Sequence, residues 1–198
     1  MTAQTSAGAR RHDSGIFFRH LIQQQKEFWV GPYSKEHWNS RTPILMIGIS
    51  AASFSLDGAP SRNLREAEFF KGLNDALDST SANWSLAAYP LGFMIIGELT
   101  NHAPIAEYGW KSGEAIITAF STMAALKAAT RRARPHTGET YAFFKSGNSF
   151  PSGHSAAVWA VAAVTTRHFS DRKWIPWIVY PAAAVVSFSR VTSGHHFV

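Results

Sequence analysis

A basic segment in the second half of the chain has the residue types needed to bind an anion. It spans residues 127–135 (KAATRRARP) and follows an apolar run over 115–126. On a helix, Lys127 and Arg134 would be close to two turns apart and would share one face. Arginine offers a planar fork that fits phosphate oxygens, and lysine offers a point charge. Taken alone, the segment is more typical of a solvated helix end whose cations complement the helix dipole.

A second segment combines a helix start with a titratable side chain. It reads Phe150-Pro151-Ser152-Gly153-His154 and precedes a small, apolar run over 155–166. Proline disfavours helix for the residue before it, and serine is a favoured N-cap, so the pattern predicts a helix start here. Free backbone N–H groups at a helix start favour an anion, and a glycine lets an oxyanion approach the backbone. His154 would stand beside that anion as an acid.

The third segment, residues 189–196 (SRVTSGHH), adds an arginine and a histidine pair after an apolar stretch. A histidine pair can bind a metal ion, but too few other candidate ligands cluster here. We therefore predict an anion site and no metal site.

Together the three segments resemble the signature of the type 2 phosphatidic acid phosphatase (PAP2) superfamily. The family pattern is K-x6-RP, then PSGH, then SR-x5-H followed shortly by Asp. Residues 127–135, 151–154 and 189–196 fit these blocks in order, with 15 residues (136–150) and 34 residues (155–188) between them. The resemblance covers the chain from Lys127 onward, and the first hundred residues carry no diagnostic motif.

The resemblance implies a metal-independent phosphoric ester hydrolase that acts on phosphate monoesters or lipid (di)phosphates through a phosphohistidine, with no cofactor. It implies that His196 is the nucleophile and that His154 is the general acid and base. The phosphate oxygens would be held by the remaining motif residues, Lys127, Arg134, Ser152, Gly153 and Arg190. Arg131, Arg132, His136 and His195 lie beside motif positions without matching them, and we assign them to the solvated surface.

The Asp of the third block does not occur before the last residue, Val198. We expect the chain to be truncated at its C-terminus, with the Asp and a final helix following. That Asp would fix the tautomer of His196. If the chain truly ends at Val198, the alternative is a non-catalytic anion- or lipid-binding module of the PAP2 type.

Two further alternatives concern the ligand. A vanadium-dependent haloperoxidase shares the same anion cradle and binds vanadate there, and the sequence does not separate it from a phosphatase. A nucleic-acid binder is disfavoured, because the apolar segments are rich in aromatic residues and no recognised binding motif occurs. We expect the partner to be a phosphorylated lipid or a small phosphoester, with a membrane surface as a second partner. By resemblance we expect a cell-envelope location, membrane-associated or periplasmic, although no signal peptide is visible.

The elements that must position these residues are predicted to be helices. Apolar residues recur at helical spacing, no strand alternation persists, and the mean hydropathy of −0.10 favours a compact all-α bundle with the active site at its helix ends. The chain has no cysteine and a formal net charge of +6, which suits anionic partners. We predict a disordered tail over 1–15 and an amphipathic helix with a linker over 16–42, the helix lying on a membrane or docking on the domain. Residues 43–198 form the predicted catalytic domain.

Overall fold

The computed structural model describes residues 14–30, 70–72, 74–75, 77, 83–134, 143–145 and 147–193. Within these ranges the regular structure is helical and contains no strand, which confirms the predicted all-α class. Five helices have defined bounds: α1 (Ser14–Val30), α5 (Asn83–Leu99), α6 (Ala103–Thr130), α7 (Gly153–His168) and α8 (Pro176–Thr192). Most of the predicted tail, the linker and the apolar stretch over 43–56 lie outside the described residues.

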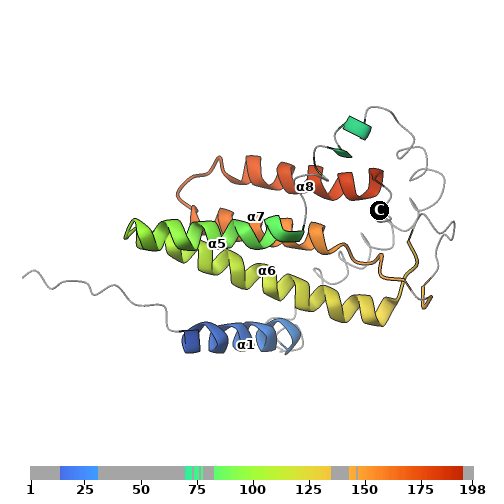
Figure 1. Cartoon of the computed structure of the whole chain (residues 1–198), viewed down its shortest axis with the longest axis horizontal. Helices are drawn as coiled ribbons and strands as arrows, with labels where there is room; N and C mark the ends of the chain where they lie inside the picture. The colour runs from blue at the N-terminus through green and yellow to red at the C-terminus, as the bar shows by residue number, and fades with distance from the viewer. Residues whose placement is uncertain are drawn as a thin grey trace, which may run out of the picture.

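The long helix α6 is the centre of the bundle, and the other helices are arranged around it (Figure 1). It packs against α5 on one side and α7 on another, and α7 packs against α8. The N-terminal helix α1 lies along α6, where Gln24 donates a hydrogen bond of 3.0 Å to the buried carboxylate of Glu114. Helix α1 therefore contacts α6, and the alternative predicted for it, lying on a membrane, stays a prediction.

Two glycines allow α5 and α6 to pack closely near their connecting turn. A Cβ atom on Gly97 would lie 2.2 Å from the backbone nitrogen of Ala106, and one on Gly109 would lie 2.5 Å from that of Met94. Real Cβ atoms do not approach backbone this closely, so both positions depend on the absence of a side chain. The two helices therefore pack with their backbones close together, at positions that only glycine allows.

A chain of hydroxyl groups connects α5, α6 and α7. Thr165 donates to the Val161 carbonyl over 2.7 Å, so it accepts from the Tyr108 hydroxyl at 2.6 Å. Tyr108 in turn accepts from Tyr89 at 2.5 Å. Burial raises the pKa of Tyr89 well above its usual range, and its bond to Tyr108 raises it further. Each donated proton therefore has an acceptor, as buried hydroxyls require.

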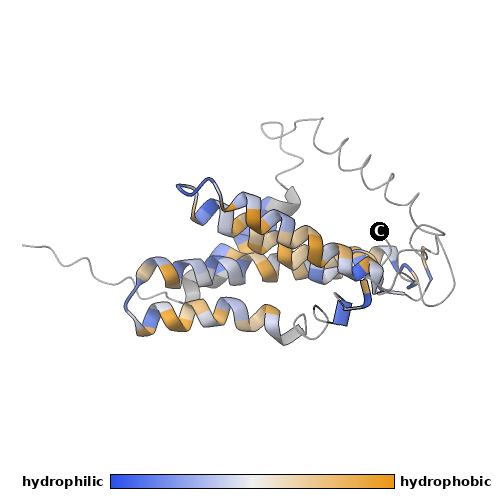
Figure 2. Cartoon of the chain, turned by 90° about the horizontal axis from the view of Figure 1, so that it is seen from above, coloured by the Kyte–Doolittle hydropathy of each residue, from blue (hydrophilic) through white to orange (hydrophobic). Residues whose placement is uncertain are grey.

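No helix in the described ranges has the length and apolar character needed to cross a membrane. In Figure 2 the hydrophilic colours gather at the connecting loops, whereas the helices carry most of the hydrophobic residues.

Candidate functional site

Three helix ends meet at one end of the bundle. Figure 1 shows the C-terminal ends of α6 and α8 and the N-terminal end of α7 on the same side of the molecule. These ends carry the described candidate residues: Lys127 in the last turn of α6, His154 in the first turn of α7, and Arg190 in the last turn of α8. The predicted placement of the candidate residues at helix ends is therefore observed for these three.

The predicted helix through Lys127 and Arg134 is wrong in one respect. Helix α6 ends at Thr130, and Arg131 takes a left-handed conformation with φ of 43° while its N–H bonds the Lys127 carbonyl. Arg134 therefore lies beyond the helix and shares no helical face with Lys127. The helix ends where the carbonyls of residues 130–132 accept hydrogen bonds from the segment that leads into α7, and Pro135 also disfavours helical geometry for Arg134.

After α6, the chain is fixed by pairing with the segment that leads into α7. Three backbone bonds cross between these segments: Phe144 N–H to the Thr130 carbonyl (2.9 Å), Gly147 N–H to that of Arg131 (3.3 Å) and Ser149 N–H to that of Arg132 (3.0 Å). We call these paired segments, residues 130–133 and 147–150, the junction. The junction fixes the end of α6 relative to the start of α7.

Side chains reinforce the junction at both ends. The Thr130 hydroxyl donates to the Phe150 carbonyl over 2.9 Å, and the buried Ser149 hydroxyl donates to the Ala133 carbonyl. Arg134 donates from Nε to Asn148 Oδ1 over 2.9 Å, which orients its guanidinium. Arg134 is thus positioned by the junction and not by a helix.

The start of α7 has the predicted cap. Ser152 has extended backbone geometry, and its hydroxyl accepts from the Ser155 N–H at 3.4 Å. Gly153 is the first helical residue, and a Cβ atom there would lie 3.2 Å from the Phe120 ring. His154 follows in the same turn and is half-buried. The first turn of a helix offers unbonded N–H groups and the positive end of the helix dipole, and these favour an anion.

Arg190 lies on the buried side of α8, with only 5% of its surface exposed. Its neighbour Ser189 is fully buried, and Thr192 donates to Asn74 Oδ1 over 2.8 Å. A cation this deeply buried needs compensating interactions, and its guanidinium is well suited to an oxyanion. The end of α8 therefore contributes a fixed positive charge to the same end of the bundle.

The surroundings of Lys127 disfavour its charged form. Burial lowers the pKa of Lys127, and the positive charge of Arg134 lowers it further. The two candidate cations are thus close enough to repel each other, although they share no helix. A bound anion would relieve this repulsion.

Arg132 was assigned to the solvated surface from sequence, and this is wrong. It is 1% exposed, and its guanidinium lies 4.9 Å from the centroid of the Phe143 ring and 5.9 Å from that of Phe150. The sequence signal for this burial was the presence of Phe143 and Phe150 in the segment that follows, since aromatic rings can pack against a guanidinium. Arg132 thus stabilises the junction from inside, as a cation packed beside two aromatic rings that also contact each other.

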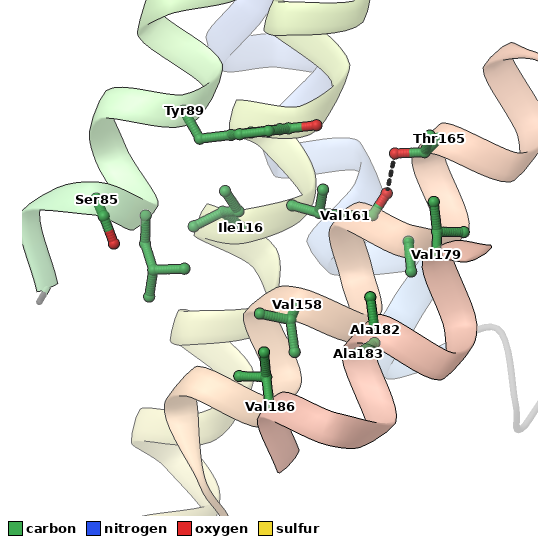
Figure 3. Close-up of a pocket in the computed structure, with 12 residues that line it drawn as sticks. Ser85, Tyr89, Ile116, Val158, Val161, Thr165, Val179, Ala182, Ala183 and Val186 are labelled. Atoms are coloured by element: carbon green, nitrogen blue, oxygen red, sulfur yellow. Dashed lines mark hydrogen bonds between the residues drawn. The ribbon is translucent and has the colours of Figure 1, made fainter. Parts of the chain in front are cut away.

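An apolar cavity of about 380 Å³ lies among α5, α6, α7 and α8 (Figure 3). None of the candidate phosphate-binding residues lines it. Its lining residue Val158 nevertheless follows His154 by one helical turn, and Val186 precedes Arg190 by one turn. The cavity thus extends from near the helix ends into the bundle, with Tyr89 and Thr165 among its few polar groups (Figure 3).

His196, the predicted nucleophile, lies outside the described residues. Within the part of the chain that the structure describes, no three His, Asp or Glu side chains are grouped so that they could hold a metal ion. The described candidates place cations and helix-terminal N–H groups on one side of the bundle, a combination that can bind an oxyanion.

Replacing Gly147 by alanine should break the junction. The new Cβ atom would lie 2.0 Å from the Arg132 carbonyl oxygen and 2.5 Å from Ala133 Cα, and backbone on both sides would have to move. We expect a loss of about 1–3 kcal/mol in unfolding free energy, measured by urea denaturation. Gly92→Ala is the matched control: a Cβ atom there meets nothing within 4 Å, and the variant should gain about 0.5–1 kcal/mol. Equal stability of the two variants would contradict the described junction.

Comparison with known families agrees with the residue pattern. Residues 108–198 match the sequence model of the PAP2 superfamily. The matched range begins on α6 and contains all seven candidate site residues. No curated protein and no solved structure shows a significant match to the chain. Members of this family generally hydrolyse phosphoesters. Over residues 108–198 this chain is therefore similar to the PAP2 superfamily, a phosphatase-type family.

Proposed function

We propose that this protein hydrolyses phosphate esters and transfers the phosphoryl group through a histidine. The observation that carries the proposal is that Lys127, His154 and Arg190 belong to three helix ends that lie on one side of the bundle. A phosphoryl group passes through a transition state with negative charge on its equatorial oxygens, so fixed cations and N–H groups stabilise it. The match of residues 108–198 to a phosphatase-type family supports the same reaction class.

The proposed reaction has two steps. A ring nitrogen of His196 attacks phosphorus, a P–N bond forms, and the P–O bond to the alcohol breaks while His154 gives that oxygen a proton. Water then attacks phosphorus, His154 takes its proton, and the P–N bond breaks to release phosphate. The position of His154, in the first turn of α7 beside the helix-terminal N–H groups, supports this role.

Lys127, Arg134 and Arg190 are proposed to hold the phosphate oxygens, together with the Ser152 hydroxyl and the Gly153 N–H. The lowered pKa of Lys127 supports this, because a cation strained by burial and by Arg134 gains most from an anion. Arg134 held by Asn148 and Arg190 held in the core are fixed before the anion arrives. Preorganised charges of this kind need no rearrangement during the reaction.

The Lys127→Met variant tests the cradle through stability. The folded state lowers the pKa of Lys127, so the unfolded state binds more protons between that pKa and the ordinary lysine value of 10.5. The loss of folding stability caused by the charged Lys127 is therefore fully present at neutral pH, and it disappears as the pH rises through that window. Lys127→Met should consequently unfold at a Tm no lower than the parent protein at pH 7.

Orthovanadate, which mimics the transferring phosphoryl group, should raise the Tm of the parent protein by about 5–10 °C at about one hundred times its Kd. Lys127→Met should lose this shift. Lys111→Met is the matched control, since Lys111 lies on the same helix and its 2.6 Å pair with Glu107 is exposed. A full vanadate shift in Lys127→Met would count against the proposed cradle.

The apolar cavity supports a substrate with a hydrocarbon portion. Its volume of about 380 Å³ lies within the range of small-molecule sites, and its lining is almost entirely aliphatic. Along α7 it extends from Val158 to Thr165, about 10 Å of helix. We infer that the alcohol part of the phosphoester carries an alkyl chain that enters this cavity while the phosphate stays at the helix ends.

Val158→Phe should block the cavity next to His154. We expect kcat/KM for dodecyl phosphate to fall at least about tenfold, because the chain loses its apolar contacts, while that for p-nitrophenyl phosphate stays within about twofold. Ala163→Phe, on an exposed position of α7 that does not line the cavity, is the control. A parallel loss with both esters would refute the chain-binding role but leave the hydrolase proposal intact.

A further inference from the structure

The apolar cavity has hydroxyl groups at the end that lies away from the candidate site. Three of its lining residues carry a hydroxyl, Ser85, Tyr89 and Thr165, and the other lining residues are aliphatic. Thr165 follows His154 on α7 by about 16 Å along the helix axis. In Figure 3 the Tyr89 hydroxyl lies on the side of the cavity that carries Thr165. These two hydroxyls therefore mark the far end of the cavity.

The direction of the hydroxyl chain is fixed by its last member. A threonine hydroxyl has one proton, and Thr165 gives its proton to the Val161 carbonyl over 2.7 Å. Tyr108 must therefore donate to Thr165, and Tyr89 must donate to Tyr108. Burial keeps the pKa of Tyr89 well above its usual range, so its hydroxyl stays protonated and its proton stays on the bond to Tyr108.

The Tyr89 oxygen is left as an acceptor. Its only proton is already used, whereas its lone pairs are not, since no described residue donates to it. Tyr108 is 3% exposed and does not line the cavity, so a ligand there cannot reach its oxygen. The Thr165 hydroxyl already accepts from Tyr108. A ligand in the cavity can therefore bond Tyr89 only by donating a proton to it.

We propose that the hydrocarbon ligand of this cavity carries a hydroxyl group at its far end, which donates a hydrogen bond to the Tyr89 oxygen. The ligand is taken to be the alcohol part of the phosphoester, and this step rests on the proposed function. The substrate class is then an alkyl phosphate with a second hydroxyl at the opposite end of its chain. A hydroxyl fits better than an ammonium group, because a charge would lose its hydration among aliphatic side chains.

The length of the cavity sets where this second hydroxyl must be. An extended dodecyl chain is about as long as the distance along α7 from His154 to Thr165. Polar groups that are few in an otherwise apolar site fix the orientation of a ligand and supply specificity. Tyr89 is therefore a specificity-determining residue, at the far end of the substrate from the phosphate.

Two isomeric neutral ligands test the acceptor without any phosphate. Octanol can donate a hydrogen bond, whereas heptyl methyl ether, which has the same atoms, cannot. We expect Tyr89→Phe to lower the preference for the alcohol, as a ratio of Kd values from titration calorimetry, about three- to tenfold. The effect is modest because Tyr89 is 40% exposed and water can offer the same bond. Ser85→Ala removes the other hydroxyl that α5 gives the cavity, and this matched control should keep the ratio.

Thr165→Val tests whether the direction of the chain matters. Tyr108 then loses its acceptor and can donate to Tyr89, so Tyr89 can donate into the cavity. The preference for octanol should disappear, and the ether should bind more tightly than it does to Tyr89→Phe. A purely structural role of these hydroxyls would weaken both ligands alike. Circular dichroism checks that each variant is folded.

Phosphoesters connect the acceptor to the substrate. The parent protein should hydrolyse dodecyl phosphate with a terminal hydroxyl at a kcat/KM about three- to tenfold above that of plain dodecyl phosphate, and Tyr89→Phe should remove this difference. An alcohol preference that survives in Tyr89→Phe, or that is lost in Ser85→Ala instead, would overturn the inference, as would no binding of either neutral ligand. Failure to hydrolyse both esters would contradict the proposed function alone, because the Kd ratio of the neutral ligands needs no hydrolysis.

Discussion

The candidate site depends on the hydrogen-bonded junction between residues 130–133 and 147–150. Helix α6 has ended by then, and the pairing of these segments holds Arg134 and, together with the packing of α6 on α7, the start of α7 relative to Lys127. Gly147 allows the two backbones to approach, and Arg132 fills the interior between Phe143 and Phe150. The candidate groups at the end of α6 and the start of α7 could not keep their relative positions if this connection were loose.

The same arrangement concentrates positive charge at a cost to the ligand-free protein. Lys127 is partly desolvated and repelled by Arg134, and Arg190 is buried in the last turn of α8. Sites that bind or transfer charged groups commonly store such strain, because the ligand relieves it. The rest of the bundle supplies the compensating stability, through the close packing at Gly97 and Gly109 and the continuous hydroxyl chain from Tyr89 to Thr165.

The sequence was informative where structure is decided locally. The cap at Ser152 and the helix after it follow from the Pro-Ser-Gly pattern, and the all-α class follows from helical spacing of apolar residues. It was misleading where contacts join residues far apart in the chain. The spacing of Lys127 and Arg134 suggested a shared helical face, and Arg132 resembled a surface cation. Both predictions failed because the junction, which ends α6 and buries Arg132, joins segments about twenty residues apart. Residue spacing within one segment does not predict hydrogen bonds to a distant segment.

The central claim is that the phosphoryl group passes to His196, and trapping the intermediate tests it most directly. The protein would be mixed with a phosphoester labelled in its phosphate, quenched in base during turnover, and digested for mass spectrometry. The account predicts a base-stable, acid-labile phosphoryl group on the peptide that contains His196, and its absence in His196→Ala. Turnover with the label on Ser152, or with no protein-bound phosphoryl group, would contradict it.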